Sequence, residues 1–453
     1  MSDAVSGVKY VLDRTGIEFF RIFEQFGDTP GGVDAIAQRF LIDINQARRD
    51  YDAFLRRLDQ AQHCRGSTLP GQYHAVLEPT AGCNGGCPHC YHSNHKDQWP
   101  LDRYDTVLEQ LERAGIRSVS ITGGEVFSTH FVERFFPLVD RLRERGFSIA
   151  SVSTNATFVT ETVRDRILAE ISKDTVFRIS LDAVDSDLLD RVRPGYRKLA
   201  DPYGPIADLD NADYNLVFTT NLSVQTVTGV LEIAEHLRRY SNITTWNVRS
   251  AVPMRTTDID RASQARAKRI ELHRALPDPS MPIPYYHAIL ERHADTPFAF
   301  DILMGNFLTT SSLAHPAVLE PRTGSNPCHD DEELMVIKAN GMVSQCPALP
   351  ELDSSLQAGS LFEPNDALEL SRDYAQHLPL AGLDTTTMVC RNCEFRSFCG
   401  GGCRLYSLAY GQTLTGCDLP AKALLDWIKD DESLLFRRNW PAYHARFVSM
   451  IGS

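Results

Sequence analysis

The chain has 453 residues, a formal net charge of −13 and an apolar fraction of 43%. A chain of this length and composition is expected to be globular and to fold into more than one domain. The acidic balance lacks the cationic surface that nucleic-acid binding requires, and no uncharged apolar run reaches the roughly 20 residues that cross a bilayer. The first residues contain no basic patch followed by an apolar stretch. We therefore predict a cytoplasmic protein with neither a nucleic acid nor a membrane as partner.

Residues 1–62 are predicted to form a small helical domain. Apolar residues recur at helical spacing in Ile17–Phe26 and again in Val33–Ala37, and Asp43 is placed to cap a third helix. The Gly, Ser and Pro content of residues 63–72 is typical of a linker.

Residues 73–300 show strand patterns that alternate with amphipathic helices, which predicts a parallel sheet covered by helices. The expected strands are Tyr73–Leu77, Arg117–Thr122, Phe147–Thr154, Val176–Leu181, Tyr214–Thr220 and Ile243–Arg249. The expected helices include Tyr104–Arg113, Phe131–Arg145 and Val227–Tyr240, and Arg255–Ala299 is predicted to be mostly helical. Six such units favour a fold of the α/β class, a partial (β/α)6 barrel that resembles a TIM barrel without closing. Its active site is expected at the carboxyl ends of the strands.

Residues 301–453 are predicted to form a third domain, which is rich in cysteine, glycine and turns from Pro327 onward. Seven of the 11 cysteines lie in the last third of the chain, and three more lie between positions 83 and 90. Because disulfides are rare in a reducing cytosol, the short spacings indicate metal or cluster ligation.

The first cysteine group, Cys83-x3-Cys87-x2-Cys90, directly follows the first expected strand. Three thiolates on one loop can hold three corners of a [4Fe–4S] cluster and leave the fourth iron open, because a fully ligated cluster takes four cysteines. Glycines and a proline allow the loop to wrap closely: Gly82, Gly85, Gly86 and Pro88. Zinc is the alternative, because further imidazoles follow at His89, His92 and His95.

This cysteine spacing after a first barrel strand resembles the radical S-adenosylmethionine (radical SAM) superfamily. The resemblance implies an enzyme whose open iron binds the amino and carboxylate groups of S-adenosylmethionine (SAM). Reduction of that cluster would yield a 5′-deoxyadenosyl radical, which removes a hydrogen atom from the substrate.

Three further segments resemble the family's cofactor-binding pattern, and one position departs from it. Thr122-Gly123-Gly124-Glu125 resembles the Gly-Gly-Glu segment, which contacts the methionine amino group of SAM. Ser153-Thr154-Asn155 and Ser180-Leu181-Asp182 resemble two strand ends that face the ribose and carboxylate, although ordinary turn chemistry also places such residues there. His89 stands where the family has an aromatic residue near the adenine. The resemblance thus assigns cofactor contacts to Gly123, Gly124, Glu125, Ser153, Asn155, Ser180, Asp182 and His89.

The late cysteines follow the pattern Cys328-x12-Gly341-x4-Cys346, then Cys390-x2-Cys393-x5-Cys399-x3-Cys403, then Cys417. This order resembles the SPASM extension found behind many radical SAM barrels, and zinc ribbons are the alternative. The resemblance implies two auxiliary [4Fe–4S] clusters. One would be held by Cys390, Cys393, Cys399 and Cys417, and the other by Cys328, Cys346 and Cys403 with an unidentified fourth ligand. Cys64 is left over as a free thiol.

The N-terminal domain resembles a winged-helix element that captures a precursor peptide by strand addition, with only Val8–Leu12 available for the strands that begin that element. A helical cap on the barrel is the alternative interpretation.

The predicted function is therefore radical hydrogen abstraction from a ribosomal precursor peptide, giving a crosslink or another oxidative change. A reductant such as flavodoxin or ferredoxin would be a second partner. Two alternative enzymes are a sulfatase-type maturase, disfavoured because Pro347 follows Cys346 where that group has an acidic residue, and an enzyme that modifies a small molecule or cofactor. A protein limited to electron transfer or zinc binding would have no use for the Gly-Gly-Glu segment. No catalytic acid or base is predicted.

Overall fold

The computed structural model divides the chain into two compact units, Met1–Gln72 and Tyr73–Ser453. The division falls at the end of the expected linker. The structure describes residues 22, 30–40, 42–51, 74–87, 89–90, 92, 97–157, 159–194, 196, 201, 203–251, 278–292, 296, 298–304, 308–309, 334–344, 346–352, 357–363, 367, 369–370, 389–393, 395, 399, 402–409 and 416–430.

The first unit contains helix α2 (Pro30–Phe40) and a second helical stretch over residues 44–51. Asp43 caps the second stretch, because its Oδ1 accepts hydrogen bonds from the backbone N–H groups of Asn45 and Gln46 at 2.9 and 3.1 Å. This confirms the cap predicted from the sequence. The two helical stretches share a small buried core: Val33, Ile36, Ala47 and Tyr51. The expected strand and most of the expected first helix lie outside the described residues.

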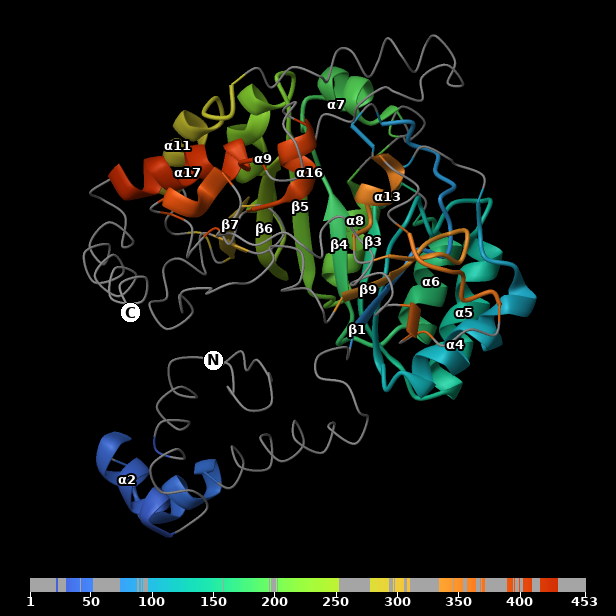
Figure 1. Cartoon of the computed structure of the whole chain (residues 1–453), viewed down its shortest axis with the longest axis horizontal. Helices are drawn as coiled ribbons and strands as arrows, with labels where there is room; N and C mark the ends of the chain where they lie inside the picture. Colours follow the sequence, from blue (N-terminus) through green and yellow to red (C-terminus); the bar gives the residue numbers. More distant parts are fainter. Residues whose placement is uncertain are drawn as a thin grey trace. The chain divides into compact units, whose positions relative to one another are not determined.

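The second unit is built on one sheet in which ten strands of the described residues follow the order β10-β9-β1-β2-β3-β4-β5-β6-β7-β8. Among these strands, all neighbours from β9 to β7 pair in parallel, and β10 and β8 at the two edges pair antiparallel. Figure 1 shows the central strands side by side. The sheet is open. The strands are β1 (His74–Leu77), β2 (Ser118–Ile121), β3 (Ser148–Thr154), β4 (Val176–Ser180), β5 (Leu216–Leu222), β6 (Ile243–Ser250), β7 (Ala299–Met304), β8 (Leu308–Thr309), β9 (Leu334–Ile337) and β10 (Val343–Ser344).

The predicted parallel α/β sheet is confirmed, and β1 to β6 lie at the six expected strands. Two parallel strands were missed. β7 extends the sheet beyond β6, and β9 pairs with β1 in the register His74↔Leu334. A four-residue strand within a cysteine- and turn-rich region has too weak a local pattern to be recognised, because long-range pairing is what stabilises it. The sheet therefore continues past the boundary expected at residue 300.

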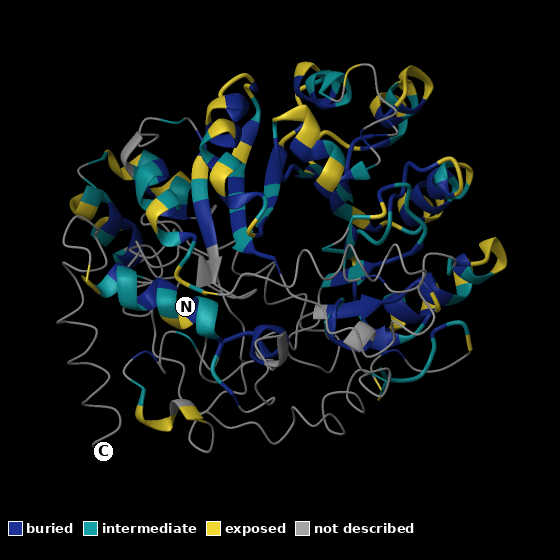
Figure 2. Cartoon of the chain, turned by 90° about the horizontal axis from the view of Figure 1, so that it is seen from above, coloured by how far each residue is buried: buried dark blue, intermediate teal, exposed yellow. Residues whose placement is uncertain are grey.

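Helices of the second unit cover the sheet between its strands. They are α4 (Tyr104–Arg113), α5 (Val132–Glu144), α6 (Glu161–Glu170), α7 (Ser186–Val192), α8 (Gly204–Asn211), α9 (Val230–Leu237), α11 (Ile283–Arg292), α13 (Leu349–Leu352), α16 (Arg404–Ala409) and α17 (Leu419–Asp430), with 3-10 turns η2 (Leu101–Arg103), η4 (Val227–Gly229) and η6 (Val389–Asn392). In Figure 2 their outer sides carry the exposed residues, and buried residues face the sheet. Among the described helices, none combines the length and apolar character that crossing a membrane requires.

The two faces of the parallel strands differ in chemistry. One face is apolar and packs against the helices, as Val119 and Ile121 of β2 and Phe177 and Ile179 of β4 do. The opposite face carries polar side chains at alternating positions, such as Ser118, Ser120, Ser151, Arg178 and Asn247. Parallel sheets with both faces buried usually have apolar residues on both. Residues of the polar face, among them Arg178 and Asn247, line the cavity described below.

A buried ion pair joins the carboxyl ends of β1 and β9. Lys338 Nζ lies 2.5 Å from Glu78 Oε2, and the exposed fractions of the two side chains are 5% and 0%. Lys338 also donates from Nζ to the carbonyl of Pro347 at 2.6 Å, and its own carbonyl accepts from Trp99 Nε1 at 2.8 Å. One side chain thus connects the first strand to the segment that contains Cys346.

We expect Lys338→Met to lower the free energy of unfolding by about 3–5 kcal/mol, because it leaves a buried carboxylate without its counter-charge. Urea unfolding measures this. The double variant with Glu78→Gln removes both charges and is expected to regain part of the loss. Arg141→Met, which breaks an exposed pair with Glu144, should cost less than about 1 kcal/mol. If Lys338→Met and the unaltered protein unfolded at the same urea concentration, the ion pair would not stabilise the fold as we expect.

Candidate active site

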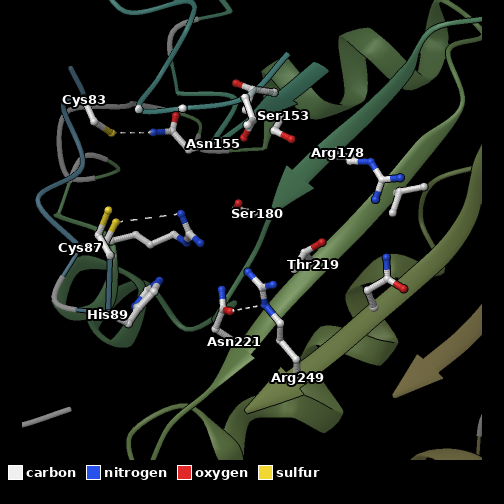
Figure 3. Close-up of a pocket in the computed structure, with 18 of the residues that line it drawn as sticks. Cys83, Cys87, His89, Ser153, Asn155, Arg178, Ser180, Thr219, Asn221 and Arg249 are labelled. Atoms are coloured by element: carbon white, nitrogen blue, oxygen red, sulfur yellow. Dashed lines mark hydrogen bonds between the residues drawn. The ribbon is translucent and has the colours of Figure 1, made fainter. Parts of the chain in front are cut away.

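The loop after β1 brings Cys83, Cys87 and Cys90 to the wall of one cavity of about 640 Å³ (Figure 3). Gly85 leaves room between two of the thiols, because a Cβ there would lie 3.0 Å from Cys87 Sγ and 3.4 Å from Cys83 Sγ. Its N–H also donates to Cys83 Sγ at 3.2 Å. Gly85 therefore lets the loop pass close to two of its own sulfur atoms.

The electrostatics of the thiols suit a bound cationic group. Burial, together with the nearby Glu125 carboxylate, raises the pKa of Cys83 to about 12. Burial also raises the pKa of Cys87, although the charge of Arg193 partly offsets this. Thiols of this kind remain protonated until a metal group replaces their protons, since thiolate is the ligating form.

The arrangement of donors fits an iron–sulfur cube. No fourth cysteine lines the described part of the cavity wall, and within the described residues no three His, Cys, Asp or Glu side chains could share a single metal ion. In a cube each thiolate binds a different iron, so the three sulfur atoms do not need a common point. The triplet therefore fits a [4Fe–4S] cluster with one open iron.

Gly123 and Gly124, which follow β2, hold the base of the cysteine loop. The backbone N–H of Gly124 donates to the Thr80 carbonyl at 2.7 Å. A Cβ on Gly124 would lie 2.0 Å from the carbonyl oxygen of Gly82, and one on Gly123 would lie 2.2 Å from that of Thr80. Gly123 also has a φ of 124°, which L side chains rarely adopt. Both glycines line the cavity, and they are required where two backbones meet.

Glu125 is fully buried and does not line the cavity. Its Oε1 accepts from Thr154 Oγ1 at 2.8 Å and from the Phe127 N–H at 3.1 Å, and its Oε2 accepts from the Asn155 N–H at 2.7 Å. Burial raises the pKa of Glu125, and these hydrogen bonds oppose the rise. In this structure the carboxylate joins the end of β2 to the end of β3. Its expected contact with the cofactor stays a prediction.

Asp182, after β4, is the centre of a buried charge network. Its Oδ2 lies 2.7 Å from Arg193 Nε and 3.1 Å from His89 Nε2, and its Oδ1 accepts from the Asn221 N–H at 2.7 Å. Burial alone would raise the pKa of Asp182, but Arg193 and His89 hold it well below its usual range. Arg193 Nη1 also reaches Cys87 Sγ at 4.0 Å.

Arg193 was missed by the sequence analysis. No spacing rule links an arginine beyond α7 to a cysteine loop more than 100 positions earlier. The only available signal was a second charge close in sequence to Asp182, and that signal is shared by many surface residues. His89 lines the cavity and its Nε2 lies 3.1 Å from Asp182 Oδ2. Its place near an adenine stays a prediction.

The ends of β3 and β4 complete this side of the cavity, which Ser153, Asn155 and Ser180 line. Their contacts with a cofactor stay predictions. Asn155 donates from Nδ2 to Asn84 Oδ1 in the cysteine loop at 3.1 Å and lies 3.9 Å from Cys83 Sγ. The predicted residues thus come together at one place, except that Glu125 and Asp182 lie behind the wall.

The far wall, which the sequence analysis did not identify, comes from strands β4 to β7. It consists of Arg178, Val217, Thr219, Asn221, Thr245, Asn247, Arg249 and Asp301. These residues alternate along their strands, and this alternation in a parallel sheet was the signal that could have revealed them.

The late cysteines are described in part. Cys328 lies outside the described residues, and of Cys390 only the backbone, in η6, is described. Burial raises the pKa of Cys403 to about 12, and Asp418 and Cys346 add to the rise. The charges of Cys393 and Cys417 both act on Lys422. Cys403 and Cys346 belong to one of the expected ligand sets. Cys393 and Cys417 belong to the other. Asp418 is an N-cap of α17, since its Oδ1 accepts from the Ala421 N–H at 3.0 Å.

Residues 77–200 match the family model described as the radical SAM superfamily. The chain carries a radical SAM domain. It is accordingly an enzyme. A comparison with curated proteins finds no match.

Solved structures of two other proteins share this fold. Streptococcus suis SuiB bound to S-adenosylmethionine superposes with a TM-score of 0.54 at 16% identity, over 92% of this chain and 94% of that chain. SuiB bound to its precursor peptide SuiA gives the same values. Native anSMEcpe with bound AdoMet has a TM-score of 0.53 at 12% identity, over 82% of this chain and 98% of that chain.

The radical SAM match covers only one side of the cavity. Residues 77–200 include the cysteine loop, the glycines after β2 and the ends of β3 and β4. The wall from β5 to β7 lies outside it. The family model therefore accounts for the cysteine side of the cavity and for Arg178, but not for the wall residues on β5 to β7.

We expect Gly124→Ala to lower the iron and sulfide that the chain binds, because the added Cβ would displace the base of the cysteine loop. Iron and sulfide analysis after anaerobic reconstitution measures this. Gly229→Ala is the matched control, since its Cβ would meet only Leu188 at 3.6 Å. An unchanged iron content in Gly124→Ala would show that the loop tolerates the shift.

Proposed function

We propose that this radical SAM enzyme removes a hydrogen atom from a ribosomally made precursor peptide and leaves it crosslinked or otherwise oxidised. The observation that carries the proposal is a single cavity with three thiols on one side and a polar, partly charged wall on the other. A cavity of about 640 Å³ is within the usual range of small-molecule sites. It is open to a ligand beyond the cysteine loop.

Peptide substrates are supported by what related folds are known to bind. SuiB has been solved with its precursor peptide SuiA, and anSMEcpe with AdoMet and the Cp18Cys peptide. The anSMEcpe peptide complex has a TM-score of 0.51 at 12% identity, over 83% of this chain and 99% of that chain. Likeness at such identity concerns the fold, so the substrate class is our proposal.

Cys83, Cys87 and Cys90 would hold the SAM-binding [4Fe–4S] cluster. When bound and reduced, this cluster supplies the electron that cleaves SAM to a 5′-deoxyadenosyl radical. Gly123 and Gly124 would keep the loop in place and expose backbone groups to the methionine end of SAM. Ser153, Asn155, Ser180 and His89 would orient its remaining polar groups, with Glu125 and Asp182 fixing the strand ends from behind. Arg193 places a positive charge beside Cys87, which favours the thiolate form.

The late cysteines would hold two auxiliary [4Fe–4S] clusters in the SPASM arrangement, with Cys390, Cys393, Cys399 and Cys417 for one and Cys328, Cys346 and Cys403 for the other. A polar contact connects this region to the radical SAM sheet, because Tyr406 in α16 donates its hydroxyl to the carbonyl of Ser250 at the end of β6. The electron that the substrate radical loses on oxidation would leave by this side. A reductant such as flavodoxin or ferredoxin would be the partner that reduces the SAM-binding cluster.

The first test is Cys87→Ala, which we expect to reduce 5′-deoxyadenosine formation to background, because a loop with two thiolates no longer holds the cluster. The measurement is product formation from SAM with dithionite under anaerobic conditions. Cys64→Ala is the matched control and should retain full cleavage. Cleavage that survives in Cys87→Ala would refute the ligand assignment.

The second test concerns the unit Met1–Gln72, which we propose captures the leader of the peptide. Removing residues 1–72 should weaken binding of a candidate precursor peptide at least tenfold, since the captured segment loses its docking surface. Cleavage of SAM without peptide should continue, because the cysteine loop lies in the other unit. Unchanged peptide affinity would mean that the unit has only a structural role.

A further inference from the structure

The charged side chains that line the described cavity wall differ in the groups that they contact. Arg193 is paired with Asp182 at 2.7 Å, and Arg249 donates from Nε to Asn221 Oδ1 at 2.8 Å. Asp301 lines the wall on β7 and is 9% exposed. Arg178 differs from these residues, because it stands on the central strand β4 and its one described donor contact is to a neutral hydroxyl.

A chain of hydrogen bonds across four strands positions Arg178. Its Nε donates to Ser151 Oγ at 3.3 Å, and Ser151 Oγ lies 2.8 Å from Ser120 Oγ. The ring of His74 closes the chain, with Nε2 3.0 Å from Ser120 Oγ and Nδ1 3.0 Å from Ser118 Oγ. Burial and the charge of Arg178 lower the pKa of His74, so the imidazole is neutral near pH 7 and adds no second charge. The network therefore fixes the guanidinium by its Nε edge.

The remaining guanidinium nitrogens face the cavity. Arg178 lines it and retains an exposed side-chain surface although its strand is interior to the sheet. Burial nevertheless lowers the pKa of Arg178, and no carboxylate in the described part of the chain opposes that shift. A guanidinium offers a planar pair of donors that matches a carboxylate. Its free edge is thus suited to an anion supplied from outside the protein.

The position of Arg178 separates it from the cysteine loop. It precedes Ser180 by two residues on β4, which is about 6.6 Å further from the carboxyl ends of the strands. Its partner in the register is Val217, and Thr219 lies between Arg178 and Arg249 in Figure 3. In that view Arg178 lies across the cavity from Cys83 and Cys87. This depth favours an anion that belongs to the substrate over the carboxylate of SAM.

We propose that Arg178 anchors a carboxylate of the peptide substrate, on an acidic side chain or at the C-terminus, and so places the reacting residue in the cavity. The inference rests on the proposed peptide function and deepens it by naming the recognised group. The overall charge of −13 would repel a carboxylate from most of the protein surface. The positive charge of Arg178 within the cavity would therefore favour binding of the carboxylate there.

The test uses three synthetic peptides on the reconstituted enzyme with SAM bound. They are acetyl-Gly-Gly-Glu-Gly-Gly-amide, its Gln counterpart, and acetyl-pentaglycine with a free terminal carboxylate. Isothermal titration calorimetry under anaerobic conditions gives each dissociation constant. We expect the Glu peptide or the free carboxylate to bind about tenfold more tightly than the Gln peptide, the size of one charge-assisted hydrogen-bonded pair. The pair of acidic peptides distinguishes a side-chain from a terminal carboxylate.

Arg178→Gln should reduce that advantage to less than about twofold, and Arg178→Lys should retain part of it, since lysine keeps the charge without the fork. Arg143→Gln on α5, where the side chain is 60% exposed, is the matched control and should retain the full advantage. The thermal midpoint of each variant shows whether it is folded.

Three outcomes would overturn the proposal: equal binding of acidic and Gln peptides to the unaltered enzyme, an advantage that persists in Arg178→Gln, or a tenfold loss of SAM affinity in that variant. The last would assign Arg178 to the carboxylate of SAM. The general function fails separately, if the unaltered enzyme forms no 5′-deoxyadenosine from SAM.

Discussion

The cavity depends on the close approach of two backbones, where the glycines after β2 meet the residues that precede the cysteine loop. Carbonyl oxygens of Thr80 and Gly82 occupy the space that side chains on Gly123 and Gly124 would need. Two short hydrogen bonds, Gly124 N–H to Thr80 and Glu125 N–H to Gly82, then fix the loop to the sheet. Because the three thiols belong to this loop, the backbone contact helps to set where their sulfur atoms lie.

Buried charged side chains surround that backbone contact. Glu125 and Asp182 lie behind the wall, and each is satisfied by several donors from neighbouring strand ends. Both therefore act as rigid connectors, while the negative charge of Glu125 opposes thiolate formation at Cys83. Arg193 acts in the other direction at Cys87. Such opposed effects are typical of sites in which a bound cation completes the charge balance.

Much of the site could be predicted because it depends on local patterns. The strands β1 to β6 have clear periodicity, and the triplet Cys83, Cys87 and Cys90 lies within eight residues of sequence. What was missed depends on long-range geometry. β9 is a strand only because β1 offers an edge, and Arg193 matters only because α7 returns it to the cysteine loop. Arg178 looked like an ordinary strand residue, and only the three-dimensional cavity shows which way its free edge faces.

The pairing of β9 with β1 also affects biosynthesis. On the ribosome β1 emerges early, while its neighbour Leu334–Ile337 is synthesised only after most of the chain. Until then one side of β1 is an unpaired edge, of the kind that invites intermolecular pairing. Since Glu78 at the end of β1 also awaits Lys338, the nascent sheet cannot be completed beside its cysteine loop before the late segment arrives. The part of the sheet beside the cysteine loop is thereby completed only after residues 334–338 have been synthesised.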